Sequence, residues 1–88
     1  MINLVKIYTK SCTPCKMLTP ILNDLKKEYE GIIDIKEVCV DDGIPEEYKD
    51  LNIMSTPTVL FFKDGVFKDK VSGLKVKQVY KDVIEELK

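Results

Sequence analysis

Two cysteines placed two residues apart, Cys12 and Cys15, constrain this chain more than any other feature. They stand between a β-type run at positions 4–8 and a helical pattern that starts near Pro14 and continues to Tyr29. Cys12 is therefore expected at or next to a helix N-terminus, with Pro14 in the first turn, where its missing N–H costs nothing. Unpaired backbone N–H groups and the helix dipole favour a thiolate there. Cys15 lies one turn further, close enough to attack a sulfur on Cys12, which suits a reversible dithiol/disulfide couple.

A Cys-x-x-Cys pair can also be half of a zinc or iron–sulfur site. A structural zinc site usually has four ligands, and this chain has no histidine and only 3 cysteines. A position between a strand and a helix is the one expected of a redox motif, so we expect redox chemistry and no metal. The other structural alternative is an inert pair of thiols in a helical turn. It is less favoured because helix N-termini activate thiolates.

The chain has 88 residues, of which 44% are hydrophobic, and a net charge of −1. These values predict one domain over residues 1–88 with a single core. The mixed charges give no basic stripe for nucleic acid and no acidic tail. The longest apolar run, residues 58–62, is too short to span a bilayer, and the first residues lack a signal-peptide pattern. We therefore expect a monomeric, cytoplasmic protein with no nucleic-acid or membrane partner. In that compartment a CxxC is more often catalytic than structural.

The hydrophobic pattern predicts seven elements of secondary structure. Pro20 should kink the first helix and Gly31 should end it. The third strand is apolar on both faces and should be central, whereas the charged fourth strand should lie at an edge, after a hairpin turn at residues 64–65. The expected strands are residues 3–9, 34–40, 58–63 and 66–72, and the expected helices are residues 14–29, 45–51 and 76–87.

The resulting order is β-α-β-α-β-β-α, which belongs to the α/β class. The first two strands should be parallel and joined by a right-handed crossover through the kinked helix. The last two strands should form an antiparallel hairpin. The sequence therefore predicts a four-stranded mixed sheet with helices on both faces.

The stretch CTPCKMLTPIL at residues 12–22 resembles the C-G-P-C-K-M-x-x-P-I-L pattern of the thioredoxin family, including the proline that kinks the helix. The segments STPT at 55–58 and FFKDG at 61–65 are similar to that family's cis-proline loop, strand and hairpin glycine. VSG at 71–73 matches the glycine that borders the family's active site. The resemblance covers almost the whole chain, and several motifs in the correct order are far more specific than CxxC alone. It implies a thioredoxin-like fold.

The sequence departs from the family pattern at four points. The usual N-terminal strand and helix are missing, which makes the expected architecture glutaredoxin-sized. Ser11 replaces a tryptophan, Thr13 replaces a glycine, and Lys6 replaces a buried acidic residue. These three changes bear on the redox potential and on proton transfer.

The resemblance implies a thiol-disulfide oxidoreductase that reduces disulfides in partner proteins. Reduced Cys12 attacks the partner's disulfide, and Cys15 then attacks Cys12, which releases the reduced partner and leaves an internal disulfide. No bound cofactor is expected because the two cysteines carry the electrons. Thr13 and Pro14, which lie between them, are candidate modulators of this chemistry.

The family resemblance also implies a cis bond between Thr56 and Pro57, although X-Pro bonds in general are mostly trans. A cis bond would turn the Thr56 backbone outward beside Cys12, where an extended substrate segment could pair with it. The apolar residues nearby either form a rim that docks partner proteins or serve only as loop packing. The candidate substrate-binding residues are Met54, Ser55, Thr56, Gly73 and Leu74.

Three further residues, Cys39, Lys6 and Glu37, lie on the predicted strands. Cys39 is expected to be a buried strand residue that behaves as a small hydrophobe. Lys6 and Glu37 either form an ion pair beneath Cys15 or extend separately to the edge of the sheet. If they pair, the ammonium should favour the Cys15 thiolate, and Glu37 becomes the candidate acceptor for the Cys15 proton.

Three interpretations of the function stay open from the sequence. In the first, the protein is a thioredoxin whose dithiol is regenerated by a thioredoxin reductase. In the second, glutathione regenerates the dithiol and the protein acts as a glutaredoxin. The short length favours a glutaredoxin, whereas the match in the kinked helix and the lack of a clear cationic pocket disfavour it. The third alternative is a non-catalytic binding module with the same fold, which would keep its function without cysteines.

Overall fold

A four-stranded sheet forms the centre of the computed structural model, which describes all residues from Met1 to Lys88. The strand order is β2-β1-β3-β4, with β1 parallel to β2, and with β3 antiparallel to both β1 and β4. The predicted central strand and the predicted edge strand are both confirmed. Along the chain, the elements are β1 (Ile2–Tyr8), α1 (Thr13–Glu28), β2 (Ile33–Cys39), η1 (Glu46–Leu51), β3 (Thr58–Lys63), β4 (Val66–Ser72) and α2 (Lys77–Leu87).

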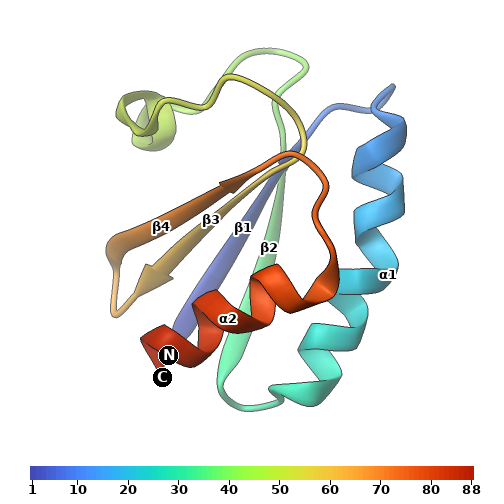
Figure 1. Cartoon of the computed structure of the whole chain (residues 1–88). Coiled ribbons are helices and arrows are strands. Elements are labelled where there is room, and N and C mark those ends of the chain that lie inside the picture. The colour runs from blue at the N-terminus through green and yellow to red at the C-terminus, as the bar shows by residue number, and fades with distance from the viewer.

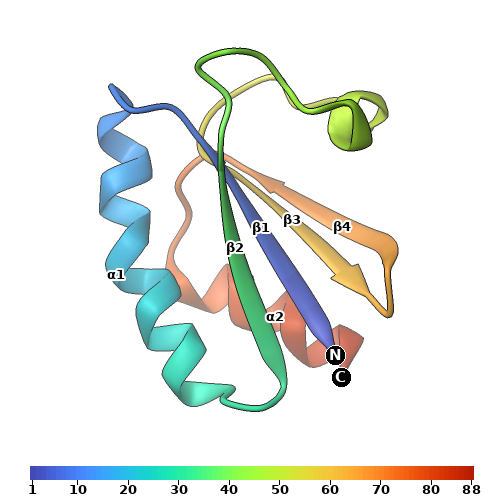
Figure 2. The same ribbon diagram turned by 180° about the vertical axis from the view of Figure 1, so that it is seen from behind.

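The two faces of the sheet are covered unequally (Figures 1 and 2). Helices α1 and α2 lie on one face, where Leu18, Leu22 and Tyr80 pack on the sheet within the larger of two hydrophobic clusters. The other face carries only η1, a 3-10 helix of 6 residues, whose Tyr48 packs against Val5, Ile7 and Leu60. The expectation of helices on both faces is confirmed, but the second helix is a short 3-10 segment. Six residues are too few for two turns of α-helix.

Helix α1 begins and ends within one residue of the predicted bounds. Cys12 is its N-cap, and Pro20 lies inside it, as predicted. At the other end the backbone N–H of Tyr29 donates to the Leu25 carbonyl at 2.9 Å, and Gly31 follows with φ 81°. A positive φ is readily adopted only by glycine, which explains why the chain turns here.

Polar contacts join the C-terminal end of α1 to α2 along most of its length. The Tyr29 hydroxyl donates to Glu85 at 2.8 Å, and Glu28 forms ion pairs with Lys77 and Lys81. Burial, and then the hydrogen bond to Glu85, raise the pKa of Tyr29 to about 12. The same hydrogen bond, helped by Lys88, lowers the pKa of the Glu85 carboxyl. These contacts fix the distance between the two helices.

The hairpin between β3 and β4 has the predicted two-residue turn. Asp64 and Gly65 have φ values of 54° and 83°. Two successive positive φ values are typical of the type I′ turn, whose twist matches that of the flanking strands. No helix of the chain combines the length and the apolar character needed to cross a membrane.

Candidate functional site

Three loops meet at one end of the sheet (Figure 1). The register aligns Ile7 of β1 with Thr58 of β3, and Thr58 with Ser72 of β4. The segments that follow β1, precede β3 and follow β4 therefore leave the sheet at the same level. The loop after β1 leads to Cys12, the N-cap of α1, and Cys15 lies in the first turn of that helix.

Cys12 and Cys15 are joined by a disulfide, with their Cα atoms 5.2 Å apart. The backbone N–H of Cys15 donates to Cys12 Sγ at 3.1 Å, so the sulfur itself caps the helix. Thr13 and Pro14, the residues between the cysteines, are exposed in the first turn. A helix N-cap favours negative charge on an acceptor atom, and this position is therefore suited to a thiolate.

The two sulfurs differ in their access to solvent. Cys12 is half-buried, whereas Cys15 is only 2% exposed. An incoming disulfide can therefore reach Cys12 more easily than Cys15. This difference separates a position for an attacking thiol from a position for a resolving thiol.

The peptide bond between Thr56 and Pro57 is cis, which confirms the prediction. The loop around it is fixed by two hydrogen bonds of 2.7 Å, from Thr58 Oγ1 to the Ser55 carbonyl and from the Gly73 N–H to the Pro57 carbonyl. Pro57 itself is fully buried. The loop before β3 and the loop after β4 are thus joined directly at the end of the sheet that carries the cysteines.

The candidate substrate-binding residues differ in exposure. Met54 is 89% exposed, the highest value among the large hydrophobic side chains, and Ser55 is also exposed. Leu74 is partly buried and packs against the main core, so it serves loop packing at least in part. Thr56 and Gly73 are half-buried. The set therefore combines one free apolar side chain, Met54, with residues that fix its surroundings.

Lys6 and Glu37 meet, which decides between the two interpretations of this pair. They are register partners on β1 and β2, and Lys6 Nζ lies 3.3 Å from Glu37 Oε2. Lys6 also donates to Thr19 Oγ1 of α1 at 2.9 Å. The Lys6 side chain is 4% exposed and the Glu37 side chain 52%. Lys6 is the only buried charged residue of the chain, and the carboxylate and the hydroxyl compensate for its desolvation.

A small cavity places this pair beside the active site. Its lining includes Cys15 together with Lys6, Thr19 and Glu37. Tyr8 of β1, Lys10 of the loop after it and Lys16 of α1 also line it. The Lys6 ammonium lies 5.5 Å from the centre of the Tyr8 ring. The buried thiol position, a buried ammonium and a half-exposed carboxylate therefore border one shared space.

Cys39 is less buried than the sequence suggested. It is a free cysteine of intermediate exposure, and its Sγ donates to Asp41 Oδ2 at 3.4 Å. The reason is its position at the end of β2, which is an edge strand rather than an interior one. The same Asp41 oxygen accepts the backbone N–H of Lys10 at 3.3 Å, so this carboxylate also holds the loop that leads to Cys12.

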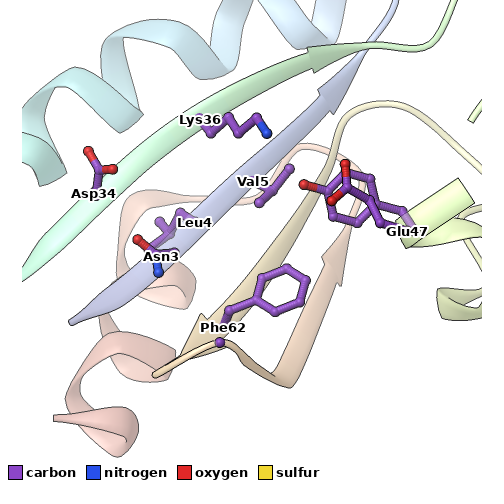
Figure 3. A pocket seen from close by; sticks show the side chains of 9 residues that line it. Asn3, Leu4, Val5, Asp34, Lys36, Glu47 and Phe62 are labelled. Atoms are coloured by element: carbon purple, nitrogen blue, oxygen red, sulfur yellow. The ribbon is translucent and has the colours of Figure 1, made fainter. Parts of the chain in front are cut away.

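Another pocket lies away from the cysteines, on the sheet face that carries η1 (Figure 3). Asn3 of β1, and Asp34 and Lys36 of β2, lie along its floor, with Phe62 of β3 and Glu47 of η1 beside them. None of its lining residues is a cysteine. The redox site therefore lies outside this pocket, at the end of the sheet where β1 leads to Cys12.

Sequence reasoning missed three residues that hold the loops of the site. Thr58 and Tyr80 use their hydroxyl groups: Thr58 binds the Ser55 carbonyl, and Tyr80 donates to the Gly73 carbonyl and accepts the Lys75 N–H. Burial raises the pKa of Tyr80. Lys70 of β4 donates to the carbonyls of Leu51, the last residue of η1, and of Asn52, which follows it. No local pattern distinguishes these residues, because each bonds to a segment that is distant or irregular.

Comparison with known proteins agrees with this site. The family model described as thioredoxin matches residues 1–86. Thioredoxin of Staphylococcus saprophyticus is 39% identical over 85 residues, which cover 97% of this chain and 81% of that protein. Thioredoxin of Staphylococcus aureus is 38% identical over the same shares of the two chains.

Solved structures show the same fold. The oxidised form of mitochondrial thioredoxin 3 from Saccharomyces cerevisiae matches with a TM-score of 0.85 and 27% identity, over 98% of this chain and 78% of that one. A mutant thioredoxin from Halobacterium salinarum has the same TM-score and identity, over 98% of this chain and 74% of that one. The family match over nearly the whole chain, together with the Cys12–Cys15 pair at a helix N-terminus, leads to one conclusion. The chain belongs to the thioredoxin family and is a thiol-disulfide oxidoreductase.

Proposed function

We propose that Cys12 is the attacking thiol and Cys15 the resolving thiol in the reduction of protein disulfides. The observation that carries this assignment is the difference in exposure, since Cys15 is 2% exposed and Cys12 half-buried at the helix N-cap. The Cys12 thiolate attacks one sulfur of the partner's disulfide and displaces the other as a thiolate, which takes up a proton. The Cys15 thiolate then attacks Cys12 Sγ, and the partner leaves as a dithiol. Two electrons pass from this chain to the partner, and Cys12 and Cys15 end as a disulfide.

The loop that ends at Pro57 is the proposed docking site for the partner's segment. Pairing of an extended segment with the Thr56 backbone would bring its disulfide to Cys12 by strand addition. Exposed Met54 and Ser55 would contact the partner on the same loop, with Gly73 and Leu74 opposite. Burying an apolar side chain that is free in the unbound protein favours such a complex.

Lys6 and Glu37 are the proposed modulators of Cys15. A buried ammonium beside a thiol favours the thiolate, and the low dielectric of the interior strengthens this effect. Glu37 borders the same cavity and reaches solvent, so it is the proposed acceptor for the proton that Cys15 loses. This arrangement would prepare Cys15 for attack on the mixed disulfide.

Proteins of this family act on disulfide substrates and are reduced by thioredoxin reductase, so a thioredoxin reductase is the proposed electron source. Glutathione is the alternative, in which case the protein acts as a glutaredoxin. The cysteine pair itself carries the electrons, and the proposed chemistry uses no bound cofactor. A cytoplasmic location and a monomeric state stay predictions from the sequence.

The roles of the cysteines are tested by Cys15→Ser and Cys12→Ser. Cys15→Ser should accumulate a mixed disulfide with oxidised insulin, visible by mass spectrometry, whereas Cys12→Ser should not. Alkylation of the reduced wild-type protein should label Cys12 first. Faster labelling of Cys15 would contradict the assignment. The same insulin assay, supplied with either thioredoxin reductase or glutathione, identifies the electron source, and retained function in the double serine variant would indicate a binding module.

A further inference from the structure

The segment from Asn52 to Pro57 has no regular secondary structure, yet it connects η1 to the cis-proline. Its far end is fixed by the hydrogen bonds of Thr58 and Gly73 described above. The end of the segment next to η1 is fixed by a residue of β4. Lys70 Nζ of β4 donates to the carbonyl of Leu51 at 3.1 Å and to the carbonyl of Asn52 at 2.9 Å.

The position of Lys70 explains how it reaches this segment. Lys70 is the register partner of Leu60, which packs against Tyr48 of η1 in the smaller hydrophobic cluster. Register partners point to the same face of a sheet, so the Lys70 side chain extends toward η1. The 3-10 helix and β4 lie near each other on that side of the molecule (Figure 1).

Two features indicate that these bonds fix the backbone at the start of the segment. Asn52 has φ 58°, a left-handed conformation that most residues with a Cβ atom avoid and that asparagine tolerates better than others. The ammonium binds the two carbonyls that flank the Cα atom of Asn52, and bonds from a charged donor are stronger than neutral ones. The Lys70 side chain forms no salt bridge, and its only hydrogen bonds are those to these two carbonyls.

We propose that Lys70 is a positioning residue for partner binding, because it fixes the start of the loop that presents Met54 and Thr56. The inference rests on the proposed docking role of this loop. Without Lys70, the segment between Leu51 and Pro57 samples more conformations, and only a fraction of them is competent to bind. The apparent affinity for a partner falls in proportion to that fraction. The Cys12–Cys15 pair lies at the N-terminus of α1, outside this segment, and is not altered.

The test uses Lys70→Met, which keeps the length of the side chain and removes the ammonium. Lys70→Arg restores cationic donors, and Lys68→Met removes an exposed charge from the same strand as a control. The substrates are insulin, a protein disulfide, and hydroxyethyl disulfide, which is too small to contact the loop. Lys70→Met should raise KM for insulin about fivefold or more with kcat within a factor of about two. The rate with hydroxyethyl disulfide should not change, Lys70→Arg should recover most of the affinity, and Lys68→Met should resemble wild type.

Backbone nitrogen-15 relaxation measured by NMR gives a readout that does not depend on catalysis. In Lys70→Met, the order parameters of residues 53–56 should fall, while those of β1 and β3 should keep their wild-type values. Lower order parameters throughout the chain, or equal losses with both substrates, would show that Lys70 serves general stability and would overturn the proposal. An unchanged KM for insulin would also overturn it. If the wild-type protein does not reduce insulin, the proposed function fails instead, and the order parameters of residues 53–56 still decide whether Lys70 fixes the loop.

Discussion

Lys6 is an ammonium group in a place where most proteins put an apolar side chain. Its side chain is 4% exposed, and its two polar partners are Glu37 and Thr19. Removing one partner of a buried pair is usually costly, whereas replacing the buried charge itself by an apolar group of similar size can be neutral or stabilising. Lys6 and Glu37 should therefore respond differently to substitution.

We expect Glu37→Gln to lower the free energy of unfolding by about 1 kcal/mol, since half of the Glu37 side chain is already solvated. Lys6→Met should change it by less than that. In the Lys6→Met background, Glu37→Gln should have almost no effect on the free energy of unfolding, because the buried ammonium that the Glu37 carboxylate stabilises is then absent. Urea unfolding of the four proteins measures this cycle, and additive effects would show that the pair is not coupled.

The same variants test the catalytic role of the pair through the pH dependence of insulin reduction. Without the ammonium of Lys6, the Cys15 thiolate should form at higher pH, so the rise in rate should move upward in pH. Glu37→Gln leaves the ammonium without its carboxylate and should move the rise downward. Tyr8, Lys10 and Lys16 border the same cavity and are identical in all variants. Profiles that coincide with wild type would contradict the proposed role of the pair.

At the scale of elements, the Tyr29–Glu85 contact between α1 and α2 has a consequence in alkaline solution. The pKa of Tyr29 is raised to about 12 in the folded protein, mainly by burial, against an ordinary value of 10.0. The folded state keeps the proton while the unfolded chain loses it. The contribution of Tyr29 to stability is therefore complete below pH 10 and is lost as the pH rises toward 12.

Tyr29→Phe should remove this part of the pH dependence. At about pH 8 the wild type should be the more stable protein, by the net value of one hydrogen bond, about 1 kcal/mol. At about pH 11 the difference should be smaller, because the unfolded wild-type chain is stabilised by ionisation. Urea unfolding at both pH values gives the comparison. A difference that stays constant or grows at high pH would contradict the assignment of the raised pKa.

The order of the elements, the parallel pairing of the first two strands and the hairpin of the last two could be predicted from the sequence because their signals are local. The pairing of β1 with β3 was not predicted. Hydrophobic period, the Asp64-Gly65 turn and the Cys-Thr-Pro-Cys stretch each involve neighbouring residues. The meeting of Lys6 and Glu37 depended on the register between β1 and β2, which no local pattern determines. The roles of Lys70, Thr58 and Tyr80 depend on bonds to loops, and the exposure of Cys39 depends on β2 being an edge. The sequence therefore indicated which residues carry the chemistry, but not which hydrogen bonds fix the loops around them.

At the scale of the whole molecule, stability should decrease from the centre of the sheet to its edges. β1 lies between β2 and β3, and β3 between β1 and β4, so both central strands have hydrogen bonds on two sides. Both also contribute residues to each of the two hydrophobic clusters. Amides of β1 and β3 should exchange only through global unfolding, and the outer amides of β2 and β4 should exchange earlier.

Hydrogen exchange followed by NMR at low denaturant concentration measures this order. The slowest amides should be those of Leu4, Lys6 and Leu60, all on the central strands. The residues of η1 should exchange before any strand, since that helix has only 6 residues and covers its face alone. If β2 exchanges as slowly as β1, the sheet unfolds as one unit and the graded stability is wrong.

The two ends of the chain also have a practical consequence. Both termini lie at the end of the molecule away from the cysteine loop (Figures 1 and 2). Met1 bonds to Asp64 in the hairpin turn, and Lys88 lies 5.9 Å from the Tyr29 ring. A tag, a surface tether or a second protein fused at either end would therefore be directed away from Cys12. Several copies of this domain could be linked in tandem, or attached to an electrode, with every reactive sulfur still facing outward.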